Sequence, residues 1–284
     1  MTVEATERWT IPGPRGVIVG VLLALALVVF GVMVRYLPQA VDWHSVFLPA
    51  ARALLSGNSP YTVSGYFNAP WALLPLLPLV ALPEAVGRAL LAIASLAALA
   101  FVAARLGAKP ITLMFLLLSP PVLHGVLNGS LDWLAALGFV LPPVVGLFFI
   151  AVKPQVGIAV AIFWFVEAAR RGGAREVVKV FAPITVALAA SLAVFGWWPL
   201  RFQQEIGLWW NASLWPSSIP VGLVLIAAAI REREIRYAIA ASPCLSPYVL
   251  LHSWVTPLLA ICRSPLYTAL AVLGMWIVVL LRAI

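Results

Sequence analysis

Acidic side chains are scarce in this sequence, so each acid beside an apolar stretch is a candidate for chemistry. The 284 residues include only 10 aspartates and glutamates. Asp42 follows the first apolar stretch and precedes an amphipathic run from Ser45 to Leu55. A carboxylate next to a lipid bilayer is costly, and such residues often serve function. We therefore predict that Asp42 is a catalytic base at the outer face of a membrane. The alternative is that it caps the helix that follows.

The remaining acids fit other roles better. Glu84 follows Leu-Pro at a predicted helix start, where free backbone amides and the helix dipole stabilise a carboxylate. Asp132 is expected to cap a helix, with membership of a site as the alternative. Glu205 lies in a tryptophan-rich segment, where it could touch a ligand. The other six acids lie in the N-terminal tail or beside basic loops: Glu4, Glu7, Glu167, Glu176, Glu232 and Glu234.

Three side chains are candidates for holding an anion. Lys153 lies between two apolar stretches, so it must snorkel to an interface or pair with an anion such as a lipid phosphate. His252, at the outer end of a late helix, could donate a hydrogen bond to phosphate or line an interface. Arg52, on the polar side of the amphipathic run, has the same two options. His44 is interpreted as a solvated histidine, with a metal site shared with Asp42 as the weaker alternative.

Composition places the chain in a membrane. Hydrophobic residues make up 63% of the sequence, charged residues 10%, and the mean hydropathy is +1.05. A soluble protein needs polar residues on the outer faces of its helices, and most apolar stretches here have none. We predict an all-α, polytopic transmembrane helical bundle that forms one domain over residues 1–284. Apolar stretches fall near 16–36, 68–82, 84–106, 110–127, 130–141, 142–152, 154–169, 180–198, 219–230, 237–251 and 264–282.

The net charge of +8 indicates membrane topology rather than nucleic-acid binding, because the cations lie mostly between apolar stretches. By the positive-inside rule, the clusters Arg170–Lys179 and Arg231–Arg236 belong inside the cell. The segment Trp197–Pro220 then lies outside, where its five tryptophans suit a membrane interface. The two cysteines, Cys244 and Cys262, stand in apolar surroundings and are expected to pack rather than to bind zinc.

The number of crossings follows from the proline-rich stretch at 68–82. If that stretch only dips into the bilayer, Asp42 and Lys153 fall on the same outer face. The chain then crosses the membrane about ten times, with both termini inside. This topology predicts an outer-face amphipathic helix directly after the first span.

Short motifs, in a particular order and spacing, resemble those of the membrane-embedded GT-C glycosyltransferases. The likeness is to the bacterial polyprenyl-phosphate-dependent family of mannosyl- and arabinofuranosyltransferases. The motifs are Asp42, Ala50–Leu55, Gly57, Pro60-Tyr61, Asn128-Gly129, Lys153-Pro154-Gln155, Ser246-Pro247-Tyr248 and His252. Two departures stand out. Ser253 occupies a position where relatives commonly have an acid, and the chain is shorter than most relatives.

The resemblance implies a GT-C-like fold in the cytoplasmic (inner) membrane and sugar transfer with inversion. The donor would be a polyprenyl-phosphate-linked sugar, and the acceptor a hydroxyl of a glycan or glycolipid. Asp42 would take the proton from that hydroxyl, while Lys153, His252 and Arg52 would stabilise the leaving phosphate. Tyr61, Asn128, Gln155 and Tyr248 complete the expected substrate-binding residues. A divalent cation, Mg²⁺ or Mn²⁺, is possible, although outer-face carboxylates are few.

Two other functions stay open on the sequence. A lipid or sugar transporter would show internal repeats and polar residues near the middle of the membrane. We find no repeat, and the notable polar groups cluster near helix ends. A non-catalytic membrane subunit is the second alternative, and it is favoured by the short chain and by Ser253.

Overall fold

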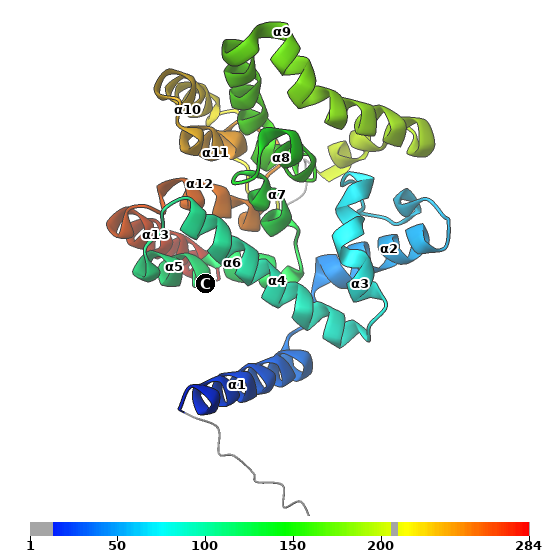
Figure 1. Ribbon diagram of the computed structural model, residues 1–284, viewed down its shortest axis with the longest axis vertical. Helices are drawn as coiled ribbons and strands as arrows, with labels where there is room; N and C mark the ends of the chain where they lie inside the picture. Colours follow the sequence, from blue (N-terminus) through cyan, green and yellow to red (C-terminus); the bar gives the residue numbers. More distant parts are fainter. Residues whose placement is uncertain (1–13, 206–209, 284) are drawn as a thin grey trace, which may run out of the picture. The chain divides into compact units, whose positions relative to one another are not determined.

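A computed structural model describes residues 14–205 and 210–283, and these residues form helices without any strand (Figure 1). The chain divides into two compact units, Met1–Pro38 and Gln39–Ile284. The first unit holds one helix, α1 (Pro14–Tyr36), which is the predicted first apolar stretch. Its residues 21–29 are all exposed. The second unit contains every candidate site residue.

The second unit is built from short helices and a few long ones. Several begin with proline at the first helical position, where the missing N–H removes no hydrogen bond. Its α-helices are α2 (Leu48–Leu55), α3 (Leu77–Val80), α4 (Glu84–Arg105), α5 (Pro110–Leu117), α6 (Pro120–Asn128), α7 (Asp132–Gly138), α8 (Pro143–Ile150), α9 (Pro154–Phe195), α10 (Ile219–Glu232), α11 (Ile235–Cys244), α12 (Val255–Ile261) and α13 (Pro265–Ala283). Tighter or wider turns form η1 (Trp43–Phe47), η2 (Pro60–Thr62), η3 (Pro70–Leu76), η4 (Trp198–Glu205) and η5 (Leu251–Trp254).

Within the described residues, two helices are long and apolar enough to cross a membrane, α4 and α9. The bent pair α5 and α6, which meet at 56°, makes a third if counted as one span. Several other apolar stretches form short helices because prolines and glycines interrupt them. Helices begin at the two Pro-Pro pairs, α6 at Pro120 and α8 at Pro143. These features indicate a helical membrane protein.

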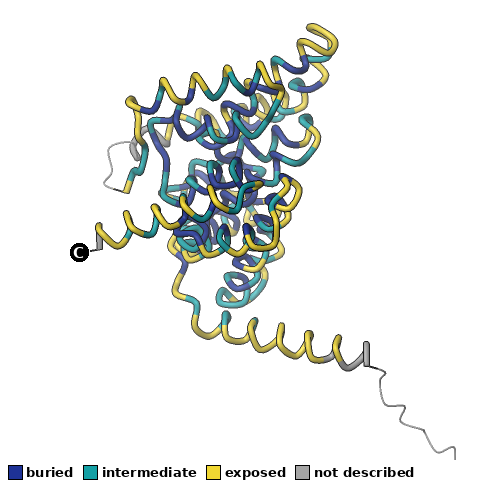
Figure 2. The backbone as a smooth tube through the Cα atoms, turned by 90° about the vertical axis from the view of Figure 1, so that its left-hand side faces the viewer, coloured by how far each residue is buried: buried dark blue, intermediate teal, exposed yellow. Residues whose placement is uncertain are grey.

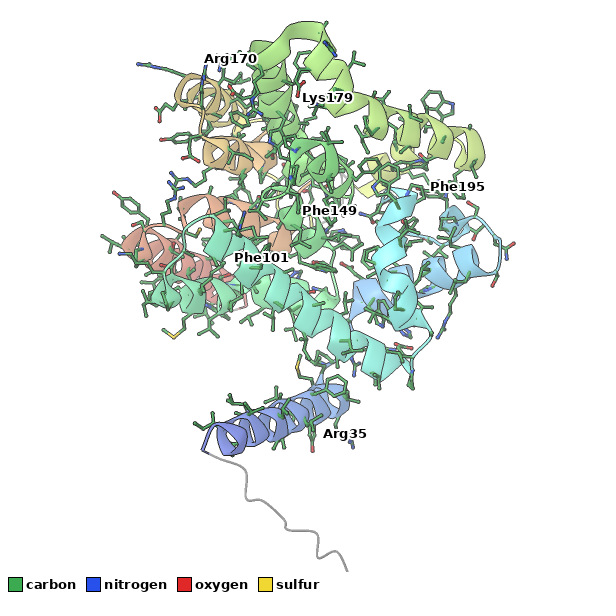
Figure 3. All side chains as sticks on the ribbon, viewed as in Figure 1. Arg35, Phe101, Phe149, Arg170, Lys179 and Phe195 are labelled. Carbon is green, nitrogen blue, oxygen red and sulfur yellow. The ribbon has the colours of Figure 1, made fainter. Side chains whose placement is uncertain are left out.

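Helix α9 is 42 residues long and bends at Gly172 and Gly173, which have non-helical backbone angles. Gly173 has φ +60°, a left-handed conformation that favours glycine. The bend divides α9 into two limbs. Arg170 and Lys179 flank this bend, and Phe195 ends the second limb (Figure 3).

The basic loops gather into one surface, the basic face. Arg170 Nη1 donates to the carbonyl of Ile230 at 2.6 Å, and this bond joins the α9 bend to the last turn of α10. Arg263 lies 3.7 Å from Glu234 and donates to the carbonyl of Leu106 at 3.0 Å. The cations of these loops are Arg105, Lys109, Arg170, Arg171, Arg175, Lys179, Arg231, Arg233, Arg236 and Arg263. Loops that the charge pattern assigns to one side are therefore neighbours in space.

Helix α4 separates the basic face from the Asp42 segment, which we define as Asp42–Leu55. Glu84 begins α4, and its Oε1 lies 2.6 Å from Nδ1 of His44 in that segment. Arg105 ends the helix at the basic face. A 22-residue α-helix is about 33 Å long, close to the roughly 30 Å thickness of a bilayer core. The Asp42 segment thus lies one helix length from the basic face.

The Asp42 segment forms the predicted amphipathic helix, as η1 followed by α2. Trp43, Leu48 and Ala51 are buried, whereas Arg52 and Leu55 are exposed. The burial pattern of the second unit is visible in Figure 2, where dark blue segments mark the helix faces turned inward.

Close helix packing in the core leaves no space for a side chain at Gly146 of α8. A Cβ there would lie 2.5 Å from Cη2 of Trp164 and 2.6 Å from the carbonyl oxygen of Gly138. We expect Gly146→Ala to lower the free energy of unfolding by about 1–3 kcal/mol, through overpacking. Thermal melting in detergent measures the effect. The matched control is Gly274→Ala in α13, where a Cβ meets nothing within 4 Å. Equal melting temperatures for the two variants would contradict the packing described here.

Candidate functional site

A buried carboxylate organises the centre of the second unit. Lys153 Nζ donates to Oδ2 of Asp132 at 2.6 Å, and the two side chains are only 6% and 4% exposed. The hydroxyls of Ser130 and Ser253 donate to the same carboxylate at 3.0 and 2.8 Å. Nε2 of His252 lies 3.3 Å from Oδ2. We call these five side chains the ionic cluster.

The ionic cluster forms where helices are interrupted. Asp132 and Ser130 come from the break between α6 and α7, and Lys153 from the break between α8 and α9. His252 and Ser253 lie in η5, after the non-helical stretch that follows α11. Broken helices bring polar groups and free backbone ends to one place inside an apolar bundle. Proline and glycine at these breaks therefore position the site.

His252 connects the ionic cluster to His124 and Asn128. Lys153 Nζ is 3.0 Å from Nε2 of His252, so the ammonium donates and the ring accepts there. Nδ1 of His252 faces Nδ1 of His124 at 3.3 Å. The two rings stack with centroids 5.4 Å apart. Asn128 joins this chain by donating to the carbonyl of His124 at 2.9 Å.

Asp42 stands beside the ionic cluster with a carboxylate that caps nothing. Its backbone is helical, with φ −63° and ψ −41°, and its side chain makes no capping hydrogen bond. Burial raises the pKa of Asp42 to about 6, the Lys153 charge opposes that rise, and the Asp132 charge adds to it. The cap alternative is therefore wrong. Asp42 is instead a half-buried carboxylate whose proton affinity suits a base near neutral pH.

Gly129 allows the Asp42 segment to approach the cluster. It ends α6 in the left-handed conformation, with φ +71°. A Cβ at this position would lie 2.8 Å from Cβ of Trp43. The glycine in the Asn128-Gly129 motif thus permits contact between the break after α6 and the residue that follows Asp42.

Two predicted residues line a cavity of about 400 Å³ next to the cluster. Gln155 and Tyr248 are part of its wall, and the neighbours of Lys153 in sequence, Val152 and Pro154, also contact it. Most of the other wall residues come from both limbs of α9, from η3 and η4, and from the stretch Leu245 to Tyr248. Its surface is mainly apolar and aromatic, which is the usual composition of a small-molecule pocket.

The remaining predicted residues lie farther from the cluster. Tyr61 stacks on Trp198 with centroids 5.6 Å apart, and its hydroxyl donates to the carbonyl of Asn68 at 2.8 Å. Arg52 is exposed on α2 and makes no ion pair with any acid that the structure describes. The side chain of Glu205 lies outside the described residues.

Three expectations need correction. Lys153 does not snorkel, because it is 5% exposed and bound to Asp132. Asp132 makes no capping bond and belongs to the ionic cluster instead. Glu84 also makes no capping bond and pairs with His44 instead. The His44 side chain is 43% exposed, so it is solvated as predicted. Among the described residues no group of three His, Cys, Asp or Glu side chains could hold a metal ion, so a metal shared by His44 and Asp42 gains no support.

Sequence reasoning missed His124 and the pairing of Asp132 with Lys153. Asp132 and Lys153 are 21 positions apart and come from different breaks between helices, so no local spacing links them. One signal was present. A buried lysine in an apolar chain needs an acid, and few acids were available.

No family model, no curated protein and no solved structure matches the chain.

Removing one partner of the buried ion pair should be strongly destabilising. Asp132→Asn leaves the Lys153 ammonium without its carboxylate, and we expect a loss of about 3–5 kcal/mol in the free energy of unfolding. The double variant Asp132→Asn with Lys153→Met should lose much less than the sum of the single losses, because neither charge remains. Chemical denaturation in detergent measures the four members of this cycle. Additive losses would show that the two side chains do not interact.

Proposed function

We propose that the protein is a GT-C-type glycosyltransferase that uses a polyprenyl-phosphate sugar donor. The observation that carries the proposal is the convergence of motifs that are far apart in sequence. Lys153 and His252 belong to the ionic cluster, Asn128 is linked to it through His124, and Asp42 lies beside it. Gln155 and Tyr248 line the adjacent cavity. Residues from separate motifs thus meet at one place, as a shared function would require.

Asp42 is the proposed base. The acceptor hydroxyl would give its proton to this carboxylate while its oxygen attacks the anomeric carbon of the sugar. The bond from that carbon to the phosphate oxygen breaks on the opposite side, and the electron pair leaves with the polyprenyl phosphate. The configuration at the anomeric carbon is therefore inverted. A pKa of about 6 makes Asp42 a stronger base than an ordinary aspartate, yet leaves it ionised at neutral pH.

The ionic cluster supports Asp42 in this proposal. The Lys153 charge favours the ionised form of Asp42, although burial and Asp132 oppose it. Relatives commonly have an acid at the position of Ser253. Here Asp132 supplies a carboxylate at that place, because the Ser253 hydroxyl donates to it at 2.8 Å and Nε2 of His252 lies 3.3 Å from it. An acid from another part of the chain thus takes the place of the missing one.

The basic face indicates how the protein is oriented in the membrane. If the positive-inside rule places that face in the cytoplasm, the Asp42 segment lies near the outer surface of the cell membrane. About ten crossings would then require that pairs of short helices, such as α5 with α6, complete single passes. Donor and acceptor would meet the enzyme from the outer leaflet. A requirement for Mg²⁺ or Mn²⁺ stays a prediction.

A transporter of lipids or sugars is the second candidate. The observation in its favour is the burial of charged groups at breaks between helices, a feature of transport proteins. Reconstituted vesicles distinguish the two functions, because a transporter moves substrate across the bilayer without forming a new glycosidic bond.

Asp42→Asn tests the proposed base. We expect this variant to reduce sugar transfer from a polyprenyl-phosphate donor by about 100-fold or more, because a positioned base contributes 10²–10⁴-fold. Product formation by purified protein with a panel of donors and acceptors is the measurement. Glu84→Gln is the matched control, since it removes a carboxylate that pairs with His44 in the same segment. Full transfer by the Asp42→Asn protein would remove Asp42 from the mechanism.

The pH dependence of transfer tests the environment of the base. Only ionised Asp42 accepts the proton, so the rate should fall as the pH drops through about 6, where Asp42 becomes protonated. A rate profile of kcat/KM from acidic to neutral pH checks this expectation. A profile that stays flat down to the ordinary aspartate value of 3.8 would show that a desolvated carboxylate is not limiting.

A further inference from the structure

We infer that the 400 Å³ cavity is the binding site for the hydrocarbon chain of a single-chain lipid phosphate, with Arg201 at its rim as the phosphate contact. This inference rests on the proposed function, because it assigns residues to the lipid part of the donor. It also changes one assignment, since Lys153 is no longer the primary phosphate contact.

The charge of Lys153 is already compensated. Its ammonium is bound to Asp132 at 2.6 Å and to His252 at 3.0 Å, and it is buried. A phosphate at Lys153 would have to compete with a bound carboxylate in an apolar interior. A leaving phosphate needs an accessible cation instead.

Arg201 is such a cation. It lies in η4, is exposed, and forms no ion pair with an acid that the structure describes. Nη1 donates to the carbonyl of Tyr61, and Cζ lies 5.7 Å from the centre of the Tyr61 ring. These contacts hold the guanidinium while leaving other N–H donors for an anion. Guanidinium groups bind phosphate with paired hydrogen bonds.

Arg201 is linked to the cavity through aromatic rings. Tyr61 stacks on Trp198, and Trp198 lines the cavity together with Pro199 from the same turn. The indole N–H of Trp198 is bound to Ser191 at 3.1 Å, and that of Trp71 to the carbonyl of Phe148 at 2.8 Å. Both indole N–H groups in the wall are thus satisfied, which leaves the rings as apolar surface.

The cavity is reached from an apolar surface that suits a membrane interface. Among its wall residues, Ile158 is 44% exposed and Leu188 is 37% exposed. Large exposed apolar side chains occur on both chain segments beside it: Trp197, Leu200, Trp210, Leu214 and Trp215. Residues 210–215 are attached to the cavity wall, because Asn211 donates to the carbonyl of Pro247 at 2.8 Å. Of the five predicted interfacial tryptophans, Trp198 is buried and Trp209 lies outside the described residues.

The volume favours one chain over two. A cavity of about 400 Å³ lies at the small end of the 300–1,000 Å³ range of ligand pockets. It therefore suits a segment of a single hydrocarbon chain better than the paired chains of a phospholipid. A polyprenyl monophosphate has this form, with a single chain and a charged head.

Binding of undecaprenyl phosphate to the purified full chain, measured by native mass spectrometry, tests the inference. Arg201→Ala should weaken binding about tenfold or more, because a charge-assisted contact is lost. Arg175→Ala is the matched control, an exposed arginine on the basic face. Leu188→Trp should block the cavity and prevent binding. Val186→Trp, on the same limb of α9 but 67% exposed and outside the wall, should bind normally.

Several outcomes would overturn the inference. Unchanged binding by Arg201→Ala and Leu188→Trp would do so, as would equal binding of phosphatidylglycerol or of inorganic phosphate by the wild-type protein. Melting temperatures show whether each variant is folded. Asp42→Asn separates the two proposals, because it should bind undecaprenyl phosphate normally while transferring no sugar. Normal transfer by Asp42→Asn with lost binding in Arg201→Ala would leave the lipid site standing and remove the base.

Discussion

The buried ion pair between Asp132 and Lys153 is the constraint on which the rest of the site depends. Each charge alone would be very costly inside an apolar bundle, so the two helix breaks that carry them must meet. At 2.6 Å the contact joins the α6–α7 break to the α8–α9 break. The hydroxyl of Ser253 brings η5 to the same carboxylate. The Asp132 carboxylate thus holds the α6–α7 break, the α8–α9 break and η5 together. The proline and glycine residues at these breaks therefore position the site as well as ending helices.

Two chemical environments lie beside this pair. In the first, Asp42 is half-buried near the charges of Lys153 and Asp132 and makes no capping hydrogen bond. The second is a mainly apolar cavity, whose wall includes Trp198 from the same turn as Arg201. A reaction between a hydroxyl and a lipid-linked sugar needs both, a base for the hydroxyl and a place for the lipid. The distance along α4 from Glu84 to Arg105 then separates this chemistry from the basic face by the length of one membrane-spanning helix.

The sequence predicted the helical membrane class and the amphipathic helix after Asp42, because apolar composition and periodicity act locally. It could not predict the number of membrane-long helices, since glycine and proline breaks divide apolar stretches in ways that hydropathy does not register. It also could not predict that Lys153 is paired with Asp132, because such contacts depend on tertiary packing. Arg201 attracted no attention for the same reason, as its importance comes from Tyr61, which is 140 residues away.

Direct titration of Asp42 tests the central claim most simply, because the chain has only two aspartates, Asp42 and Asp132. Carbon-13 labelling of the aspartate carboxyl groups should give two resonances, and Asp42→Asn assigns them. We predict that the Asp42 resonance moves with a midpoint near pH 6. The Asp132 resonance should stay constant between about pH 4 and 8, because a bound ammonium keeps that carboxylate ionised. A midpoint for Asp42 near the ordinary value of 3.8 would contradict a desolvated base beside the ionic cluster.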